Sequence, residues 1–459
     1  MTPPRREALR SEAGKALRDS TIMPPLGLLR VYSALTADGH EVRLLDADAM
    51  DWSDSLVLRE IEEFGPRVLG IGTTTAQLVD ALRVCRLIKA HDERITTVLG
   101  GPHVKYFPTE TAMQSGVDVV LRGEADLTMP QLVATLRDGG EVTSVSGVFT
   151  KRGDAIVEGP PAAPVPDLDA LAPVDRTPVR HITYRDPAMP GRLASVEMVR
   201  GCPYDCSFCS TPRGLVRHRS AGNMADEMTS IVRNDLADSI YFVDDTWNVH
   251  KVKSKAFCEE LIRRDFKTPW AARLRINTMS DELMGLMAKA GCVRVQLGVE
   301  ASTDESMATL SKRLKVEQVR KAFKMAHDAG IDTLAYFMIG LPDDRTVEDV
   351  RKTVHFARDL SPTYAVFNVF TPYPTTTLYD EGVKRNIVDD SIWRDFTRNP
   401  TRDFAPQPWT EHLPADTLYR ELKRAYRSFY FRPVRILKQL ARPSSWTRAA
   451  HAAVGMLRG

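Results

Sequence analysis

The residues most able to do chemistry are three cysteines within eight positions, Cys202, Cys206 and Cys209, which have the spacing C-x3-C-x2-C. Gly201 and Pro203 favour a loop-like backbone around them. Three thiolates so close together on one loop can face a single centre, as an iron–sulfur cluster requires. The spacing therefore predicts a metal cluster held by these three side chains.

Zinc is the alternative metal, and it needs a fourth ligand that a structural site usually draws from close by. The nearest histidine downstream is His218, nine residues beyond the last thiol. It lies among Arg213, Arg217 and Arg219, a poor setting for a metal cation. The sequence favours the iron–sulfur cluster, with a zinc or purely structural thiol group as the alternative.

Three thiolates on a cluster of four irons leave one iron without a protein ligand, which suits chemistry better than simple electron transfer. With the aromatic Phe208 before its last cysteine, the motif resembles that of the radical S-adenosylmethionine (SAM) enzymes. The resemblance implies that SAM chelates the free iron of a [4Fe–4S] cluster. It also implies that one electron cleaves SAM to a 5′-deoxyadenosyl radical. Cys202, Cys206 and Cys209 are then the metal ligands and the catalytic centre.

Composition places this chemistry in a protein of more than one domain. The chain has 459 residues, 43% hydrophobic and 27% charged, with a formal net charge of +2; these values are typical of globular domains without electrostatic attraction to nucleic acid. No apolar run approaches the roughly 18 residues of a membrane span, and the N-terminus lacks the apolar core of a signal peptide. Six cysteines, three of them clustered, indicate a reducing cytoplasm. Cys85, Cys258 and Cys292 are expected to be small buried apolar side chains.

Residues 1–140 are predicted to form a Rossmann-like domain. From residue 28 to 136, short apolar runs alternate with helical patterns, with strands expected at 41–45, 68–72, 95–99 and 117–121. Such parallel sheets bind ligands at the carboxyl ends of their strands. The candidate ligand-binding residues at those ends are Thr73, Thr74, Gly100, Gly101, Gly123 and Glu124.

Four short motifs in this domain, at 24–29, 39–42, 100–103 and 122–125, resemble in their order the cobalamin-binding domain fused to many radical enzymes. The alternative is a Rossmann-like domain that binds no ligand. The Asp-x-His-x-x-Gly motif of other cobalamin proteins is absent, so His103 is not assigned as a cobalt ligand. In the family an apolar strand precedes a Pro-Pro turn, whereas Pro3-Pro4 here follow Met1 and Thr2 directly. The first strand is therefore expected to be missing, from a truncated start.

Residues 141–192 are predicted to be a small hairpin and a proline-rich linker, followed at 193–380 by a second series of β-α units. Strands are expected at 194–200, 239–243, 271–277, 293–299, 333–339 and 365–370. The radical SAM resemblance implies a partial (β/α)6 barrel of the TIM type. Such barrels place their sites at the carboxyl ends of the strands, and the cysteine loop directly follows the first strand.

Charged residues follow the other expected strands. Asp244 and Asp245 end the second, where they would orient substrate or SAM, or else cap a helix or form an ion pair. Arg275, with Asn277, ends the third and is expected to meet a carboxylate.

The resemblance implies further SAM contacts at the fourth and fifth strand ends. It puts Glu300 against SAM and the Ile-Gly-Leu-Pro turn at Gly340 and Pro342 against adenine. The turn continues with Asp343-Asp344 where Gly-Glu is usual.

The C-terminal segment, 381–459, is predicted to be helical and basic. From Arg420 onward it has ten lysines or arginines against one acid, Glu421, interleaved with aromatic residues. Such an end lies on an anionic membrane or guards an anionic substrate, or else it packs its aromatic residues on the barrel. No nucleic-acid-binding motif accompanies the charge.

The resemblance as a whole implies a cobalamin-dependent radical SAM enzyme, expected to be a C-methyltransferase with a small-molecule or lipid substrate. A radical cyclase or rearrangement enzyme that transfers no methyl group is the first alternative, and a non-catalytic cluster- and cobalamin-binding sensor is the second. The cofactors are a [4Fe–4S] cluster, SAM and cobalamin. The expected partner is an electron donor such as flavodoxin or ferredoxin.

Overall fold

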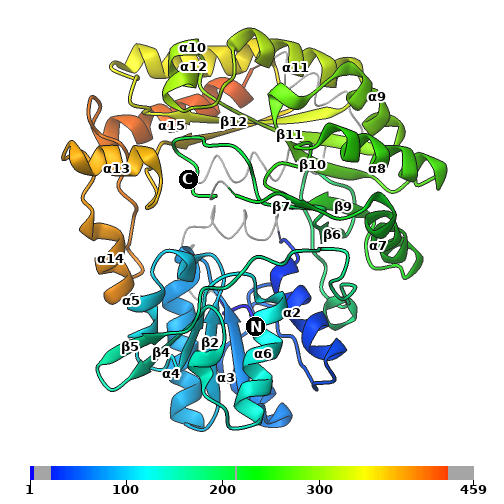
Figure 1. The fold of residues 1–459 in the computed structure, drawn as a ribbon. Helices are drawn as coiled ribbons and strands as arrows, with labels where there is room; N and C mark the ends of the chain where they lie inside the picture. Colours follow the sequence, from blue (N-terminus) through cyan, green and yellow to red (C-terminus); the bar gives the residue numbers. More distant parts are fainter. Residues whose placement is uncertain (5–21, 212–213, 433–459) are drawn as a thin grey trace. The chain divides into compact units, whose positions relative to one another are not determined.

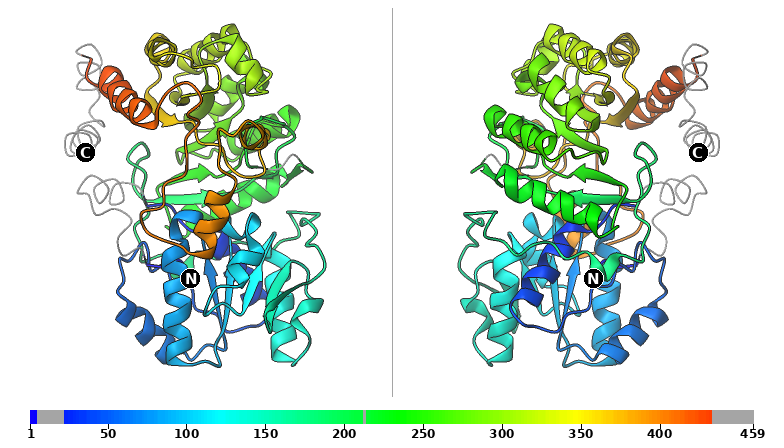
Figure 2. Two further views of the ribbon diagram at one scale, coloured as in Figure 1. Left: turned by 90° about the vertical axis from the view of Figure 1, so that its left-hand side faces the viewer. Right: turned by 90° about the vertical axis from the view of Figure 1, so that its right-hand side faces the viewer.

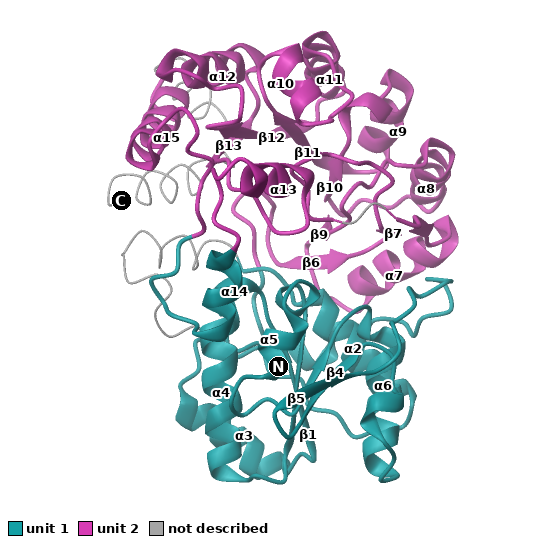
Figure 3. Cartoon of the chain, turned by 60° about the vertical axis from the view of Figure 1, so that its left-hand side comes forward, with its two compact units in different colours: residues 1–184, 391–405 teal, residues 185–390, 406–459 magenta. Residues whose placement is uncertain are grey.

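The structure is a computed structural model that describes residues 1–4, 22–211 and 214–432. It divides into two compact units, one formed by Met1–Tyr184 with Ser391–Ala405 and the other by Arg185–Asp390 with Pro406–Gly459 (Figure 3). The first unit therefore extends past the expected boundary at 140 and takes in most of the predicted linker. Among the described residues, no helix has both the length and the apolar character that a bilayer crossing would need.

The first unit is built on a five-stranded sheet with the order β1-β2-β3-β4-β5. The first three strands are parallel: β1 (Val68–Gly72), β2 (Thr96–Gly100) and β3 (Val119–Leu121). One face is covered by α2 (Leu26–Ala37) and α6 (Ala125–Arg137), and the other by α3 (Asp54–Phe64), α4 (Leu78–His91), α5 (Pro108–Ala112) and α14 (Ser391–Arg398) (Figure 2). Helices on both faces of a parallel core confirm the predicted Rossmann-like fold.

The expected hairpin is part of this sheet and not a separate junction. Its strands, β4 (Val148–Arg152) and β5 (Ala155–Glu158), continue the sheet antiparallel from β3. Phe149 and Val148 of the hairpin are buried on opposite faces, one in each of the two cores. Burial of both residues explains why the hairpin belongs to the first unit.

The strand expected at 41–45 does not form as a regular element. Only Asp46 pairs with another strand segment, through an isolated parallel bridge to Thr2. Met1 lies beside β1, where its amino group donates to the Gly70 carbonyl at 2.6 Å and its carbonyl accepts from Gly72 at 3.0 Å. Met1 and Thr2 thus hydrogen-bond to both β1 and the 41–46 segment.

The second unit is a six-stranded parallel sheet with the order β13-β12-β11-β10-β9-β6, which is sequential along the chain. Its strands are β6 (Leu193–Val196), β9 (Ser239–Phe242), β10 (Trp270–Leu274), β11 (Cys292–Glu300), β12 (Asp332–Ile339) and β13 (Tyr364–Val369). The helices that follow them lie along the outer face of the curved sheet (Figure 1), namely α7 (Ala221–Arg233), α8 (Lys251–Arg263), α9 (Asp281–Lys289), α11 (Val316–Asp328) and α12 (Val347–Leu360). The predicted partial (β/α)6 barrel is confirmed.

Local sequence sets where these helices begin. A serine or threonine precedes many of them, and its hydroxyl accepts a hydrogen bond from a backbone amide of the first turn, which satisfies a donor that the helix leaves open. These N-caps are Ser53, Ser220, Ser280, Thr303, Thr346 and Thr376. The caps fix the helix starts and so the lengths of the loops at the carboxyl ends of the strands.

The helix α15 (Ala415–Tyr430) covers the edge strand β13. The hydroxyl of Tyr426 donates to the Phe367 carbonyl at 3.0 Å and accepts from the Phe367 amide at 3.2 Å. Tyr430 makes the same pair of bonds to Ala365, at 2.8 and 3.0 Å. These bonds satisfy backbone groups that an edge strand leaves open. Tyr426, Phe429 and Tyr430 of α15 thus pack on the barrel, whereas the basic residues from 433 to 459 lie outside the described residues.

Candidate active site

The cysteine loop lies between two short strands that hold its ends together. They are β7 (Val199–Arg200) and β8 (Arg217–His218), which pair antiparallel. Gly201 has a φ of +89°, and a Cβ there would lie 2.4 Å from the Leu215 carbonyl oxygen. A side chain at this position would collide with backbone, so the loop requires glycine just before its first cysteine.

The middle of the loop is anchored through Ser207. Its amide donates to the Leu310 carbonyl at 3.1 Å, and its hydroxyl donates to the Thr309 carbonyl at 2.8 Å. Both acceptors lie at the end of α10 (Asp304–Thr309). The loop is therefore attached to the segment that follows β11 and is held at the carboxyl ends of the barrel strands.

The three thiols of the loop differ from the other cysteines of the chain. None of the six cysteines forms a disulfide; Cys202 and Cys206 are partly buried, and Cys209 is exposed. Cys85, Cys258 and Cys292 are buried, and burial raises the pKa of each thiol, that of Cys85 to about 12. Only the loop cysteines are accessible enough to bind a metal cluster.

Arg275, which follows β10, contacts the loop directly. Its Nη1 lies 3.4 Å from Cys206 Sγ, and its guanidinium carbon lies 3.7 Å from the centre of the Tyr204 ring. Its backbone amide donates to Asn248 Oδ1 at 2.8 Å, and its Nε donates to Asn277 Oδ1 at 3.0 Å. The structure places this cation against a thiol of the loop, and the carboxylate partner expected from the sequence stays a prediction.

Glu300 is close to the same loop. It has a left-handed φ of 71°, and the pairing of β11 with β12 shifts register between Gly298 and Glu300. Its carboxylate pairs with Lys312 Nζ at 3.1 Å, and both residues are 9% exposed. Lys312 Nζ also lies 5.7 Å from the centre of the Phe208 ring. Backbone strain in a buried charged pair is typical of functional sites.

The two aspartates after β9 are in different environments. Asp244 is 2% exposed and accepts hydrogen bonds from the amides of Met198 and Val199. Burial holds the pKa of its carboxyl well above the ordinary value. Asp244 therefore fixes the strand that leads into the cysteine loop, while Asp245 is exposed and is the one available to a ligand.

Gly340 forms a tight turn after β12. It has a φ of +74°, and a Cβ there would lie 2.9 Å from the Leu418 side chain. Its amide and that of Leu341 donate to Asp344 Oδ2, at 2.8 and 3.0 Å. Since its amide is already bonded and Leu418 fills the space at its Cβ, Gly340 can offer a ligand only its carbonyl. Asp344, whose role the sequence left open, holds the turn.

Burial raises the pKa of the Asp344 carboxyl to about 6, despite these two hydrogen bonds. Asp344 thus favours folding below its unfolded pKa of 3.8, and this contribution is lost as the pH rises through about 6. The whole change is worth about 3 kcal/mol. We expect Asp344→Asn, whose amide oxygen can accept both bonds, to remove this pH dependence and to stabilise the unit near neutral pH. Urea titrations of both proteins at about pH 5 and about pH 7.5 measure it; a difference in midpoint that does not change with pH would contradict it.

Small residues line the strand ends of the first unit. Thr74, Gly101 and Gly123 are exposed there, which leaves the surface open to a large ligand. Packing also constrains both glycines: a Cβ at Gly101 would lie 2.8 Å from the Thr73 carbonyl oxygen, and one at Gly123 would lie 2.9 Å from Ala162 Cβ.

Two polar residues among these strand ends are engaged within the protein. Glu124 accepts a hydrogen bond from the Val165 amide at 2.9 Å. His103 is 1% exposed, and its Nδ1 lies 3.1 Å from Thr75 Oγ1. Burial lowers its pKa to about 4, so His103 is neutral at physiological pH.

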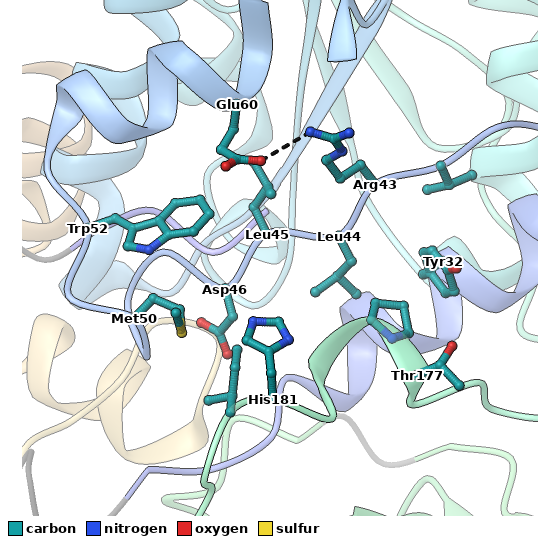
Figure 4. A pocket seen from close by; sticks show the side chains of 13 residues that line it. Tyr32, Arg43, Leu44, Leu45, Asp46, Met50, Trp52, Glu60, Thr177 and His181 are labelled. Atoms are coloured by element: carbon teal, nitrogen blue, oxygen red, sulfur yellow. Dashed lines mark hydrogen bonds and ion pairs between the residues drawn. The ribbon is translucent and has the colours of Figure 1, made fainter. Parts of the chain in front are cut away.

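The first unit also contains a pocket of about 440 Å³ next to the 41–46 segment (Figure 4). Trp52 and Met50 give it an apolar side, and the ion pair of Arg43 with Glu60, 3.1 Å long, lies at its edge. None of the six residues predicted to bind cobalamin lines it. The pocket is therefore separate from the strand-end surface.

A group of polar side chains within the barrel strands was not predicted from the sequence. Tyr241, Arg273, Gln296 and Tyr336 belong to β9, β10, β11 and β12, inside runs that are otherwise mostly apolar. The sequence does contain a signal for them, because a single arginine or glutamine within an otherwise apolar strand indicates the face turned away from the helices. Only the register shows that these four lie together.

In the described parts of the chain, no group of three or more His, Cys, Asp or Glu side chains converges on one metal ion. The thiolates of an iron–sulfur cluster bind different irons and need not converge in this way.

The fold and the site together define an α/β enzyme with a Rossmann-like unit and a partial barrel that presents three free thiols at its strand ends. The family model of the B12-binding domain matches residues 18–133, and that of the radical SAM superfamily matches residues 196–357. The chain is 30% identical over 450 residues to the uncharacterized methyltransferase PH0819 of Pyrococcus horikoshii, covering 95% of this chain and 93% of that protein. It belongs to the family of cobalamin-binding radical SAM enzymes.

The chain is also similar to two further proteins, one in sequence and one in fold. The chain is 30% identical to the anaerobic magnesium-protoporphyrin IX monomethyl ester cyclase of Rubrivivax gelatinosus, with 80% of this chain and 68% of that protein covered. Its fold matches that of the radical SAM methyltransferase TsrM from Kitasatospora setae with a TM-score of 0.67 at 19% identity, over 79% of this chain and 74% of that one. Membership of the family makes a [4Fe–4S] cluster, SAM and cobalamin the cofactors of this enzyme.

The residues of the structure fit these cofactors. The loop offers three accessible thiols that are free of disulfides, and a guanidinium beside one of them can balance the negative charge of a thiolate. The exposed glycines and threonine at the ends of β1, β2 and β3 leave space for a large ligand.

Proposed function

We propose that this enzyme methylates a carbon atom of a small-molecule or lipid substrate by radical chemistry. When bound, the cluster and SAM supply a 5′-deoxyadenosyl radical, and cobalamin supplies a methyl group. The observation that carries the proposal is the accessible thiol loop at the strand ends of the barrel. The similarity to a methyltransferase along 93% of that relative supports the choice of reaction.

The chain's own residues would then have distinct tasks in the barrel. Cys202, Cys206 and Cys209 hold the cluster, and Arg275 donates to Cys206 Sγ and balances its charge. The exposed carboxylate of Asp245 and the Glu300–Lys312 pair bind and orient SAM beside the loop.

Phe208 and Gly340 would border the SAM site. Phe208 lies beside the Lys312 ammonium, and the turn at Gly340 would meet the adenine through its backbone, because Leu418 fills the space at its Cβ. In the first unit, the surface for cobalamin would be formed by Thr74, Gly100, Gly101, Gly123 and Glu124, with Thr73 buried beneath it.

Ring formation without methyl transfer is the second candidate function. It is favoured by the 30% identity to the magnesium-protoporphyrin IX monomethyl ester cyclase. Both reactions begin with removal of a hydrogen atom from carbon and differ only in the fate of the substrate radical. The thiol loop therefore supports both equally.

The two functions differ in their co-products. A methylation of this kind consumes two SAM molecules for each C–H bond replaced by C–CH3; one yields 5′-deoxyadenosine and methionine, and the other yields S-adenosylhomocysteine. The anaerobically reconstituted enzyme would be incubated with SAM labelled with 13C in its methyl group, a one-electron reductant and a metabolite extract of cells that express the chain. We expect equal amounts of the two nucleosides and a 13C-labelled product.

The other outcomes of this experiment are equally informative. 5′-Deoxyadenosine without S-adenosylhomocysteine or a labelled product would replace the methyltransferase by the cyclase. If a fully reconstituted protein formed neither nucleoside, the proposal of a radical enzyme would be wrong.

The proposed reaction needs an electron for each SAM cleaved, which a flavodoxin or a ferredoxin would supply. Such donors and a cluster sensitive to oxygen suit a cytoplasmic enzyme. The basic C-terminus as a membrane contact also stays a prediction, because five of its ten basic residues lie beyond residue 432, outside the described part.

A further inference from the structure

The inner face of the barrel sheet, turned away from the helices, carries an unusual set of polar side chains. On β10, Trp270, Ala272 and Leu274 are buried on the helix side, where Trp270 packs against Phe242 at a ring distance of 5.5 Å. Side chains alternate between the faces of a strand, so Arg273 lies on the inner face. Its register partner on β11 is Gln296.

Two tyrosines from the neighbouring strands lie on the same face. The Tyr241 hydroxyl donates to Gln296 Oε1 at 2.9 Å, and the Tyr336 hydroxyl donates to the same oxygen at 2.8 Å. The two hydroxyls use both lone pairs of this oxygen and leave the amide NH2 of Gln296 as a donor. We name Tyr241, Arg273, Gln296 and Tyr336 the inner-face cluster.

Arg273 brings a positive charge into this cluster with no carboxylate in contact with it among the described residues. The hydrogen bond that its guanidinium makes within this part of the chain is from Nη2 to the Tyr241 hydroxyl, at 3.5 Å. Within residues 1–4, 22–211 and 214–432, no Asp or Glu oxygen lies within 4.0 Å of its guanidinium. Burial lowers the pKa of this side chain, but attraction to Tyr241, Tyr336 and Asp245 outweighs burial, and Arg273 stays charged.

Arg294, on the same face of β11, is a buried arginine with a carboxylate partner and serves as a comparison for Arg273. It is 1% exposed and forms two bonds to Asp186, at 2.6 and 3.3 Å. A buried cation without such a partner is costly. Arg273, two positions away in register, is only half-buried and has no carboxylate in contact with it in the described residues, so its guanidinium is available to a ligand that brings the counter-charge.

We propose that the inner-face cluster binds an anionic group of the substrate, a carboxylate or a phosphoryl group, through Arg273 and the Gln296 amide. This inference rests on the proposed function and narrows its substrate class. A guanidinium presents several N–H donors in a plane and binds such groups in bidentate fashion. The cluster disfavours a wholly apolar substrate, which would leave the charge of Arg273 unbalanced.

SAM also has a carboxylate, which could in principle be the anion that Arg273 binds. The position of Arg273 in the strand favours the substrate over SAM. Arg273 lies within β10, two residues or about 6.6 Å before Arg275, which follows the strand and contacts the cysteine loop. Arg275 is therefore nearer to the cysteine loop, where SAM is expected, than Arg273 is. Whether Arg273 binds the substrate and not SAM is tested by the measured SAM affinity of the Arg273→Gln variant.

The test uses two small anions, methylphosphonate and propionate, with the neutral propionamide as the matched control. Calorimetric titration of the full chain carrying its cluster, in a buffer free of phosphate and carboxylates, gives each dissociation constant. Wild-type protein is expected to bind at least one anion and not propionamide. Arg273→Gln should weaken anion binding about tenfold or more, the loss typical of a charged hydrogen-bonding partner, and Arg273→Lys should weaken it less.

The comparison of the two anions and the control measurements determine how the result is interpreted. The tighter of the two anions identifies the group as carboxylate or phosphoryl. Arg263→Gln, which removes an exposed arginine paired with Glu260, should leave anion affinity unchanged. SAM affinity and circular dichroism should be unchanged in Arg273→Gln. The proposal is overturned if wild type binds neither anion, if Arg273→Gln binds them as tightly as wild type, or if SAM affinity falls by the same factor.

Binding is measured without reductant or turnover. The proposal can therefore fail while methyl transfer succeeds, and it can hold in a protein that catalyses a different radical reaction.

Discussion

Replacing Cys206 by alanine is expected to abolish both the iron–sulfur absorbance of the reconstituted protein and the formation of 5′-deoxyadenosine from SAM. Two thiolates cannot hold a cluster that three residues of one loop are needed to bind. The loss should exceed the roughly 10- to 100-fold effect of removing a group that only supports a metal ligand. Cys206 has the further role of facing Arg275, whose Nη1 lies 3.4 Å away, so the variant also leaves that guanidinium without its thiol partner.

Cys85→Ala is the matched control for this experiment. Cys85 is fully buried in the first unit, and burial raises the pKa of its thiol to about 12, so it stays protonated and binds no metal. We expect this variant to keep the full cluster spectrum and its SAM cleavage. Iron and sulfide content, visible absorbance and chromatographic detection of 5′-deoxyadenosine measure both variants side by side. A cluster spectrum that persists in Cys206→Ala would show that other residues hold the metal.

The sequence was sufficient to predict the barrel strands because each is a short apolar run followed by a loop with polar or small residues. β9, for example, was expected at 239–243 and is observed at Ser239–Phe242. The information is local in such strands, since both faces are buried in a parallel sheet. The position of the cysteine loop followed from the same pattern.

The segment at 41–45 was wrongly predicted as a strand because a strand also needs neighbours. Its one pairing in the described structure is the bridge of Asp46 to Thr2, which is distant in sequence. The segment 391–405 likewise joins the first unit through α14, which packs against α5. Such pairings between distant residues are not encoded in a local pattern.

The candidate site was predictable to a similar extent. The cysteines could be identified from spacing alone, and the resemblance pointed to Glu300, but nothing near Glu300 in the sequence indicated Lys312 as its partner. The inner-face cluster depends on the register of three strand pairs, which brings Arg273 opposite Gln296. Register is set by the whole sheet, so the cluster could be found only in the structure.

Asp186→Asn is expected to destabilise the second unit by about 3–5 kcal/mol, the usual cost of breaking a buried ion pair from one side. The change keeps the shape of the side chain and its acceptor for the Ala188 amide, 2.8 Å away, but removes the charge that balances Arg294. Arg294 is 1% exposed and cannot regain water. Arg294→Met should cost less, because the Asp186 side chain is 19% exposed and can be hydrated. The double variant should resemble Arg294→Met, which a double-mutant cycle detects as coupling.

Urea unfolding followed by tryptophan fluorescence measures these changes, since Trp247 and Trp270 are both 0% exposed in the core of this unit. Glu260→Gln, at a surface site where Glu260 pairs with Arg263 and Arg264, is the control and should change stability by less than about 1 kcal/mol. Additive effects of Asp186→Asn and Arg294→Met would contradict the coupling. The same unfolding measurement on Arg273→Gln separates the two inner-face arginines, because a cation without a carboxylate has no ion pair to lose. Arg294 should then prove necessary for stability, and Arg273 should prove dispensable for folding while being required for anion binding.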